Sequence, residues 1–200
     1  ELFERLKKHW TDSQIVELTV AVALNGFLKR WNDTMAPALE AEPIAFGEKL
    51  FFEPRLSGTG SVLCATCHAP FRAFQDGRAR GFGLEPVDRN TPSVINARFY
   101  RWYGWDGAHD SLWSQGIRPI LDAKEMGASA AHVAKLVRED ADFACRYRKA
   151  FGTPPADDER VLVDVAKALA AFQETVTSGR TAFDEFRDAL LRKDEAGIAR

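Results

Sequence analysis

The stretch Cys64-Ala65-Thr66-Cys67-His68 is a C-x-x-C-H motif, and the fold expected for the rest of the chain depends on it. Two thiols three residues apart can form thioethers to the two vinyl groups of one porphyrin. The histidine that follows is then placed to bind the iron as its proximal ligand. The motif therefore predicts a c-type haem held by Cys64, Cys67 and His68.

C-x-x-C also occurs in zinc sites and in thioredoxin-like redox motifs. A zinc site needs two further ligands, for which the sequence offers only the distant residues Cys145, His109 and His132. A thioredoxin-like motif is expected near a βαβ pattern, and the sequence has none. Haem is therefore the favoured interpretation. The third cysteine, Cys145, is expected to be a small buried residue on a helix.

Composition limits the other possibilities. The 200 residues, 46% of them hydrophobic, can form one sizeable core or one domain with an appendage. A net charge of −2 does not indicate nucleic acid or an anionic membrane as a partner. The longest apolar run, residues 15–24, is too short to span a bilayer. Covalent haem attachment takes place outside the reducing cytoplasm, which favours the periplasm. Because Glu1 is not an initiator methionine, the chain is expected to be a mature form or a fragment.

Apolar residues recur mostly at helical spacing, so the fold class is predicted to be mainly α with little strand. Residues 40–43 are predicted to be a linker, and residues 44–119, rich in Gly, Pro and Arg, are expected to carry only short helices. The predicted helices cover residues 12–31, 46–52, 111–117, 129–139, 141–151, 159–176 and 182–191.

Aromatic residues are concentrated just before residue 114. Two interpretations stay open for any one of these rings: it packs beside the haem, or it carries electrons, because indole ionises more easily than aliphatic side chains. The rings are Phe99, Tyr100, Trp102, Tyr103, Trp105 and Trp113.

Several runs occur in the order of one known family. They are Phe46-Gly47-x-x-Leu50-Phe51-Phe52-Glu53-Pro54-Arg55-Leu56-Ser57-Gly58, the C-x-x-C-H motif, Phe74-x-Asp76-Gly77, Arg89-Asn90-Thr91-Pro92-Ser93, Trp105-Asp106-Gly107, Ser111-Leu112, Gln115, Pro119 and Glu125-Met126. From Pro43 to the C-terminus the chain resembles the bacterial di-haem cytochrome c peroxidase family, which includes the MauG-type enzymes. The resemblance implies the c-type cytochrome domain of that family as the fold.

The resemblance also implies a peroxidase that reduces hydrogen peroxide at an open haem. His68 would be the proximal ligand, and Glu125, Gln115 and Pro119 would line the opposite, distal face. Splitting peroxide requires a proton to move from the near oxygen to the leaving oxygen, which a partly desolvated carboxylate can do. Glu125 suits this role, and Gln115 could hydrogen-bond peroxide. A solvated acid at a helix start stays open as the alternative for Glu125.

Two further roles follow from the resemblance. Trp105 would lie between this haem and a second one, passing electrons from that haem, a cytochrome c or a protein substrate. Asn90 would help to hold a calcium ion between the two haem domains. The family's second C-x-x-C-H motif does not occur in this sequence, so the second haem domain is expected to be absent from this chain.

The sequence departs from the family pattern in two places. Peroxidases of this family carry a histidine in the region of residues 82–87 that blocks the resting haem, but no histidine lies between His68 and His109. The resemblance then implies an open sixth position, which MauG-type enzymes share, and this favours oxidation of a partner protein. Ala108 also replaces the arginine that usually follows Trp-Asp-Gly.

The N-terminal segment is interpreted separately. Residues 1–40 resemble the C-terminal helix of carboxymuconolactone decarboxylase or alkylhydroperoxidase-type proteins, although the catalytic cysteine pair of those proteins is missing. An ordinary amphipathic helix stays open as the alternative. Residues 1–42 are therefore predicted to be a helical appendage or the remnant of a fused domain, and residues 43–200 the peroxidatic cytochrome c domain.

A second function stays open. His/Met ligation is usual in cytochromes c, so His68 and Met126 could bind the iron of a mono-haem electron carrier. The remaining histidines, His9, His109 and His132, are expected at the surface or at helix caps. His109 is the one candidate among them for a contact with a propionate or the distal pocket.

Overall fold

The structure is a computed structural model that describes residue 11 and residues 40–194. The chain divides into two compact units, Glu1–Glu40 and Ala41–Arg200. The predicted helix over residues 12–31, the resemblance drawn for residues 1–40 and His9 fall outside the described residues. The helices below belong to the second unit.

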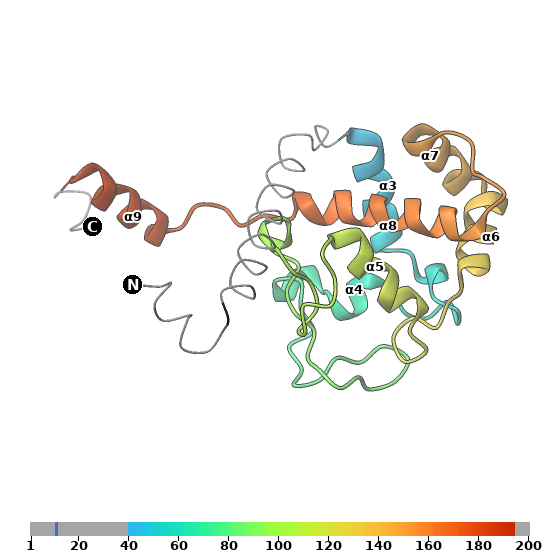
Figure 1. Cartoon of the computed structure of the whole chain (residues 1–200), viewed down its shortest axis with the longest axis horizontal. Helices are drawn as coiled ribbons and strands as arrows, with labels where there is room; N and C mark the ends of the chain where they lie inside the picture. The colour runs from blue at the N-terminus through green and yellow to red at the C-terminus, as the bar shows by residue number, and fades with distance from the viewer. Residues whose placement is uncertain (1–10, 12–39, 195–200) are drawn as a thin grey trace. The chain divides into compact units, whose positions relative to one another are not determined.

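Helix α8 (Asp158–Thr175) is the centre of this unit, and Figure 1 shows other helices gathered around it. It packs against α3 (Ala41–Phe51), α5 (Leu112–Leu121) and α6 (Ala130–Glu139), while α7 (Ala141–Phe151) packs against α3 and α6. The apolar residues that α8 buries recur every three or four positions, as expected for a helix surrounded by others. They are Val161, Leu162, Val165, Ala166, Ala168, Leu169 and Ala170.

The contact between α3 and α8 depends on one glycine. A Cβ atom at Gly47 would collide with the backbone carbonyl group of Ala168. Because Gly47 has no side chain, the two helix backbones approach closely and Phe46, Leu50 and Phe51 of α3 become fully buried. These residues form the core on which the haem-motif segment lies.

Most helix boundaries agree with the sequence pattern. Helix α7 has the predicted bounds, because the Asp140 side chain accepts hydrogen bonds from the backbone amides of Asp142 and Phe143 and so fixes its start. Helices α6 and α9 (Ala182–Arg192) differ from their predictions by one residue at one end, and α8 is shifted by one residue at both ends.

Two boundaries were predicted wrongly. Residues 40–43 are not a linker, because α3 begins at Ala41 and carries Pro43 in its first turn, where a proline removes no helical hydrogen bond. Helix α5 continues past residue 117 to Leu121 and includes Pro119 in its last turn. Both differences place a proline inside a helix end.

The prediction for Cys145 was also wrong. Cys145 lies on α7 as expected, but it is exposed. The buried side of α7 carries Phe143, Ala144 and Tyr147, and Cys145 falls on the opposite side of the helix.

Long loops and short helical turns connect α3 to α5. The turns are η1 (Pro54–Leu56), α4 (Cys64–Cys67), η2 (Pro70–Arg72) and η3 (Ala97–Phe99). Within the described part of the chain there is no strand, only the isolated bridges Phe82–Pro86 and Tyr103–His109. The mainly α fold class is therefore confirmed.

Candidate haem site

The C-x-x-C-H motif forms a single short turn of helix. Cys64 and Cys67 begin and end α4, and His68 follows as its C-cap residue. Burial raises the pKa of the Cys64 thiol to about 12 and also raises the pKa of Cys67. Both sulfurs are therefore neutral thiols in the protein without a bound group. Among the described residues no group of three or more His, Cys, Asp or Glu side chains could hold a metal ion. The zinc interpretation is thus not supported.

His68 is held by a hydrogen bond to a tight loop. Its Nδ1–H group donates to the carbonyl oxygen of Phe74 at 3.1 Å. Ala73 and Phe74 both have left-handed backbone conformations, with φ of 54° and 57°, and this turns that carbonyl group back toward the ring. Burial lowers the pKa of His68, which favours the neutral imidazole. Its Nε2 lone pair is therefore available to a metal, with the other nitrogen fixed as a donor.

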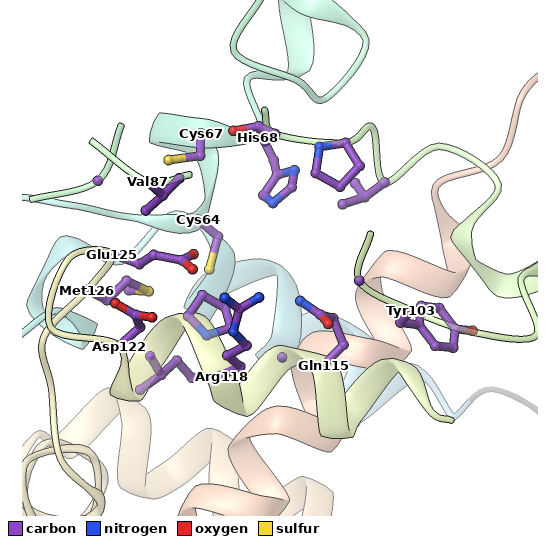
Figure 2. Close-up of a pocket in the computed structure, with 18 of the residues that line it drawn as sticks. Cys64, Cys67, His68, Val87, Tyr103, Gln115, Arg118, Asp122, Glu125 and Met126 are labelled. Atoms are coloured by element: carbon purple, nitrogen blue, oxygen red, sulfur yellow. The ribbon is translucent and has the colours of Figure 1, made fainter. Parts of the chain in front are cut away.

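A cavity of about 810 Å³ opens in front of this ring. Cys64, Cys67 and His68 form one wall of the cavity, and α5 and the loop after it form the opposite wall (Figure 2). The segments 87–94 and 100–106 complete its lining. The volume is in the range of cavities that hold large cofactors.

Helix α5 supplies three side chains to the distal wall. Gln115, Arg118 and Pro119 line the cavity from successive turns of this helix. Figure 2 shows the Gln115 amide nitrogen and the Arg118 guanidinium pointing into the cavity. The Gln115 Oε1 atom is buried and has no hydrogen-bond partner among the described residues. It lies beside Gly104, because a Cβ atom built on that glycine would be 3.3 Å from it.

Glu125 is positioned by its backbone. Its amide donates to the carbonyl oxygen of Asp122 at 3.0 Å, and its own carbonyl oxygen accepts from the amide of Leu84 at 3.0 Å. Gly83 allows this contact, because a Cβ there would come within 2.6 Å of the Glu125 Cα atom. Figure 2 shows the carboxyl group directed into the cavity, toward Cys64.

Burial is the main influence on this carboxyl group and raises the pKa of Glu125. The positive charge of Arg118 acts in the opposite direction, and the negative charge of Asp122 adds to the increase. A carboxyl group whose pKa is raised by a partly dry site can act as both acid and base near neutral pH. The solvated acid considered from the sequence is therefore the weaker description of Glu125.

The residues present fit a c-type haem. Two neutral thiols and an imidazole nitrogen with an available lone pair face one cavity of suitable volume. Gln115, which lines the same cavity, has a buried oxygen that no described residue hydrogen-bonds. Val87 and Gly83 line the cavity in the region where a blocking histidine was considered from the sequence.

Trp105 lies at the margin of the cavity. It contributes to the lining, yet it is 59% exposed. Its Nε1–H group donates to the backbone carbonyl oxygen of Asn90 at 2.8 Å, and Arg89 forms an ion pair with Asp106 at 3.3 Å. These two contacts join the segments 89–90 and 105–106. The side chain of Asn90 is exposed, and its proposed role toward calcium stays a prediction.

The other histidines with a described structure lie away from the cavity lining. The His109 ring is hydrogen-bonded to the Ser114 hydroxyl at 2.9 Å, and His132 Nε2 donates to the Arg55 carbonyl oxygen at 2.8 Å. Met126 is 3% exposed and packs in the hydrophobic core while also bordering the cavity.

Sequence reasoning missed Arg118 as a site residue. It follows Gln115 by three positions, which places both on one side of α5. This helical spacing was the signal that could have found it.

The helical fold, the C-x-x-C-H turn and the cavity together define a c-type cytochrome domain. Comparison with known proteins makes the assignment specific, because residues 41–192 match the family model described as di-haem cytochrome c peroxidase. The chain belongs to the di-haem cytochrome c peroxidase/MauG family, whose members bind c-type haem.

Individual relatives agree with this assignment. The methylamine utilization protein MauG of Methylorubrum extorquens is 42% identical over 153 residues, which are 76% of this chain and 42% of that protein. The cytochrome c551 peroxidase of Pseudomonas aeruginosa is 31% identical, over 73% of this chain and 44% of that protein. The chain therefore spans less than half the length of these relatives.

Solved structures show the same fold. A MauG-like protein associated with microbial copper homeostasis matches with a TM-score of 0.66 and 31% identity, over 76% of this chain and 45% of that one. The di-haem peroxidase BthA from Burkholderia thailandensis matches with a TM-score of 0.65 and 25% identity, over 74% of this chain and 42% of that one. No helix in the described part of the chain is long and apolar enough to cross a membrane.

Proposed function

We propose that this domain reduces hydrogen peroxide at a c-type haem attached to Cys64 and Cys67 and bound by His68. The overall reaction takes hydrogen peroxide, two electrons and two protons to two molecules of water. The observation that carries the proposal is the arrangement of one cavity. It has the attachment motif on one wall and a half-buried carboxyl group, Glu125, on the other.

The haem supplies the redox chemistry and the iron at which peroxide is reduced. The work left to the protein is proton transfer and orientation. The Glu125 carboxylate takes the proton from the near oxygen of peroxide and returns it to the far oxygen, which leaves as water. The Gln115 amide donates a hydrogen bond into the same space, and Pro119 presents an apolar, non-donating surface beside it.

Electrons would enter through Trp105. Its ring borders the cavity and is also open to the surface, so it is suited to link the haem to a donor outside this domain. The donor we propose is a second haem, a cytochrome c or an oxidisable residue of a partner protein. The MauG-type alternative, oxidation of a protein, is supported by 42% identity to a protein of that name and by the absence of histidine from residues 82–87.

The remaining elements of the proposal concern the protein around this domain. Residues 43–200 would form the peroxidatic domain and residues 1–42 an appendage. A second haem domain would face Trp105, with a calcium ion between the domains bound in part by Asn90. The periplasm is the proposed compartment, because covalent haem attachment takes place outside the reducing cytoplasm.

The mono-haem carrier with His68/Met126 ligation is less well supported. Met126 is 3% exposed and packs among core residues, whereas Glu125 and Gln115 point into the cavity. A carrier has no use for a half-buried acid and an amide donor on the distal wall.

The experiment that tests the function is the rate of reaction of the ferric, haem-loaded protein with hydrogen peroxide, followed by stopped-flow absorption. Glu125→Gln should slow the reaction about 100-fold or more, because the amide cannot accept the proton. The control is Glu85→Gln, an exposed residue of the segment that hydrogen-bonds to residues 124–125 through its backbone. Equal rates for Glu125→Gln and the wild type would refute the proton-transfer role.

A further inference from the structure

Arg118 has a position in the cavity that the proton-transfer scheme does not use. It lies in the last turn of α5, three residues after Gln115, and lines the cavity on the wall opposite His68. Figure 2 shows its guanidinium group between the Gln115 amide and the Glu125 carboxyl group. None of the described residues forms an ion pair with this guanidinium group.

The neighbouring carboxylates are engaged elsewhere. Asp122 accepts a hydrogen bond from the Lys124 amide at 2.9 Å and so closes the turn after α5. Asp106 forms its ion pair with Arg89. Glu125 faces Arg118 and lies near enough for the charges to influence each other, yet the two groups form no ion pair. The space between them is therefore open to a small molecule.

Three groups direct hydrogen-bond donors toward this space. Arg118 offers the N–H groups of its guanidinium group and a permanent positive charge, and Gln115 offers its amide N–H₂ group. Glu125 offers an O–H group when it is protonated. Arg118 is an exposed residue that lines the cavity. Donors beside its positive charge form an environment that favours a negative charge over a neutral molecule.

We propose that Arg118 makes the distal cavity a binding site for small monovalent anions. The inference rests on the proposed function, because the natural anion at a peroxide-reducing site is the hydroperoxide anion. Arg118 thereby holds the anionic form of the substrate and stabilises the negative charge that develops on the leaving oxygen. The fork of a guanidinium group also favours planar anions with two oxygens over spherical ones.

The test is equilibrium binding of fluoride and of formate to the ferric, haem-loaded full-length protein, measured by absorption titration. Arg118→Gln should weaken the binding of both anions about tenfold or more, since a charge-assisted donor is lost. Arg118→Lys keeps the charge without the fork, so fluoride should lose less affinity than formate. The control is Arg148→Gln, which removes an exposed arginine that also lies in the last turn of its helix, α7.

The proposal is overturned if Arg118→Gln changes both dissociation constants by less than twofold. If the same variant also shifts the haem midpoint potential, the guanidinium group pairs with a haem propionate instead. Should Arg118→Gln fail to incorporate haem, the fluoride and formate constants of Arg118→Lys decide. Anion binding is measured without turnover, so it can be unaffected by Arg118→Gln while the wild type still reacts with peroxide, and that result would overturn this inference alone. A wild type that does not react with peroxide would overturn the proposed function.

Discussion

The Nε1 atom of Trp105 lies 2.8 Å from the backbone carbonyl oxygen of Asn90. This hydrogen bond fixes an exposed indole at the margin of the haem cavity, and the ion pair between Arg89 and Asp106 joins the same two segments of chain. A large aromatic ring held in one orientation at the surface is suited to a contact with an electron donor.

Replacing Trp105 with Phe should slow electron delivery and leave the ferric spectrum unchanged. Phenylalanine is harder to oxidise and cannot donate to the Asn90 carbonyl oxygen. The measurement is the rate at which peroxide oxidises the pre-reduced full-length protein. Trp113→Phe is the matched control, because Trp113 lies on α5 outside the cavity lining. A rate unchanged in Trp105→Phe would reduce Trp105 to a packing role.

The peroxide reaction should depend on pH through Glu125. In the proposed scheme the ionised carboxylate accepts the first proton, so the rate falls as the pH drops through the pKa of Glu125. Burial raises that pKa, so the fall in rate should occur at a pH above 4.5, the ordinary pKa of a glutamate side chain. Asp122→Asn removes a negative charge that raises the pKa of Glu125, so the fall in rate should move to lower pH. If the rate falls at the same pH in Glu125→Gln as in the wild type, the titrating group is not Glu125.

Substitution of Gly47 should destabilise the domain. The Cβ of alanine would collide with the Ala168 carbonyl group, so α3 and α8 must separate, at a cost of about 1–3 kcal/mol in the free energy of unfolding. Chemical denaturation of the haem-loaded protein measures this change. Gly179→Ala is the control, because no atom of the described part of the chain lies within 4 Å of a Cβ built there. Equal denaturation midpoints for the two variants would contradict the close packing of α3 on α8.

Much of the helical framework was predictable from the sequence, and the cavity was not. Asp140 and the apolar spacing of residues 141–151 predict α7 correctly, because a cap and a periodic pattern are local signals. The helix boundaries near Pro43 and Pro119 were predicted wrongly, since proline is tolerated in the first turn of a helix and its energetic cost elsewhere depends on context. These errors lie at helix ends, where local patterns carry least information.

The C-x-x-C-H motif identified one wall of the site, because attachment chemistry requires those residues at that spacing. The opposite wall depends on how loops without periodicity fold back over α5. Contacts such as the amide of Leu84 with the carbonyl oxygen of Glu125 join residues far apart in sequence, so spacing alone does not reveal them. The resemblance to a family supplied Glu125 and Gln115, and only the structure revealed Arg118 beside them.

The proposed site holds a haem that is attached to Cys64 and Cys67, bound from one side by His68 and open on the other. Electron paramagnetic resonance of the ferric full-length protein tests it most directly. We expect a high-spin signal that is lost or altered in His68→Gly and is unaffected by Met126→Ala. A low-spin signal that Met126→Ala converts to high-spin would contradict the account and identify an electron carrier instead.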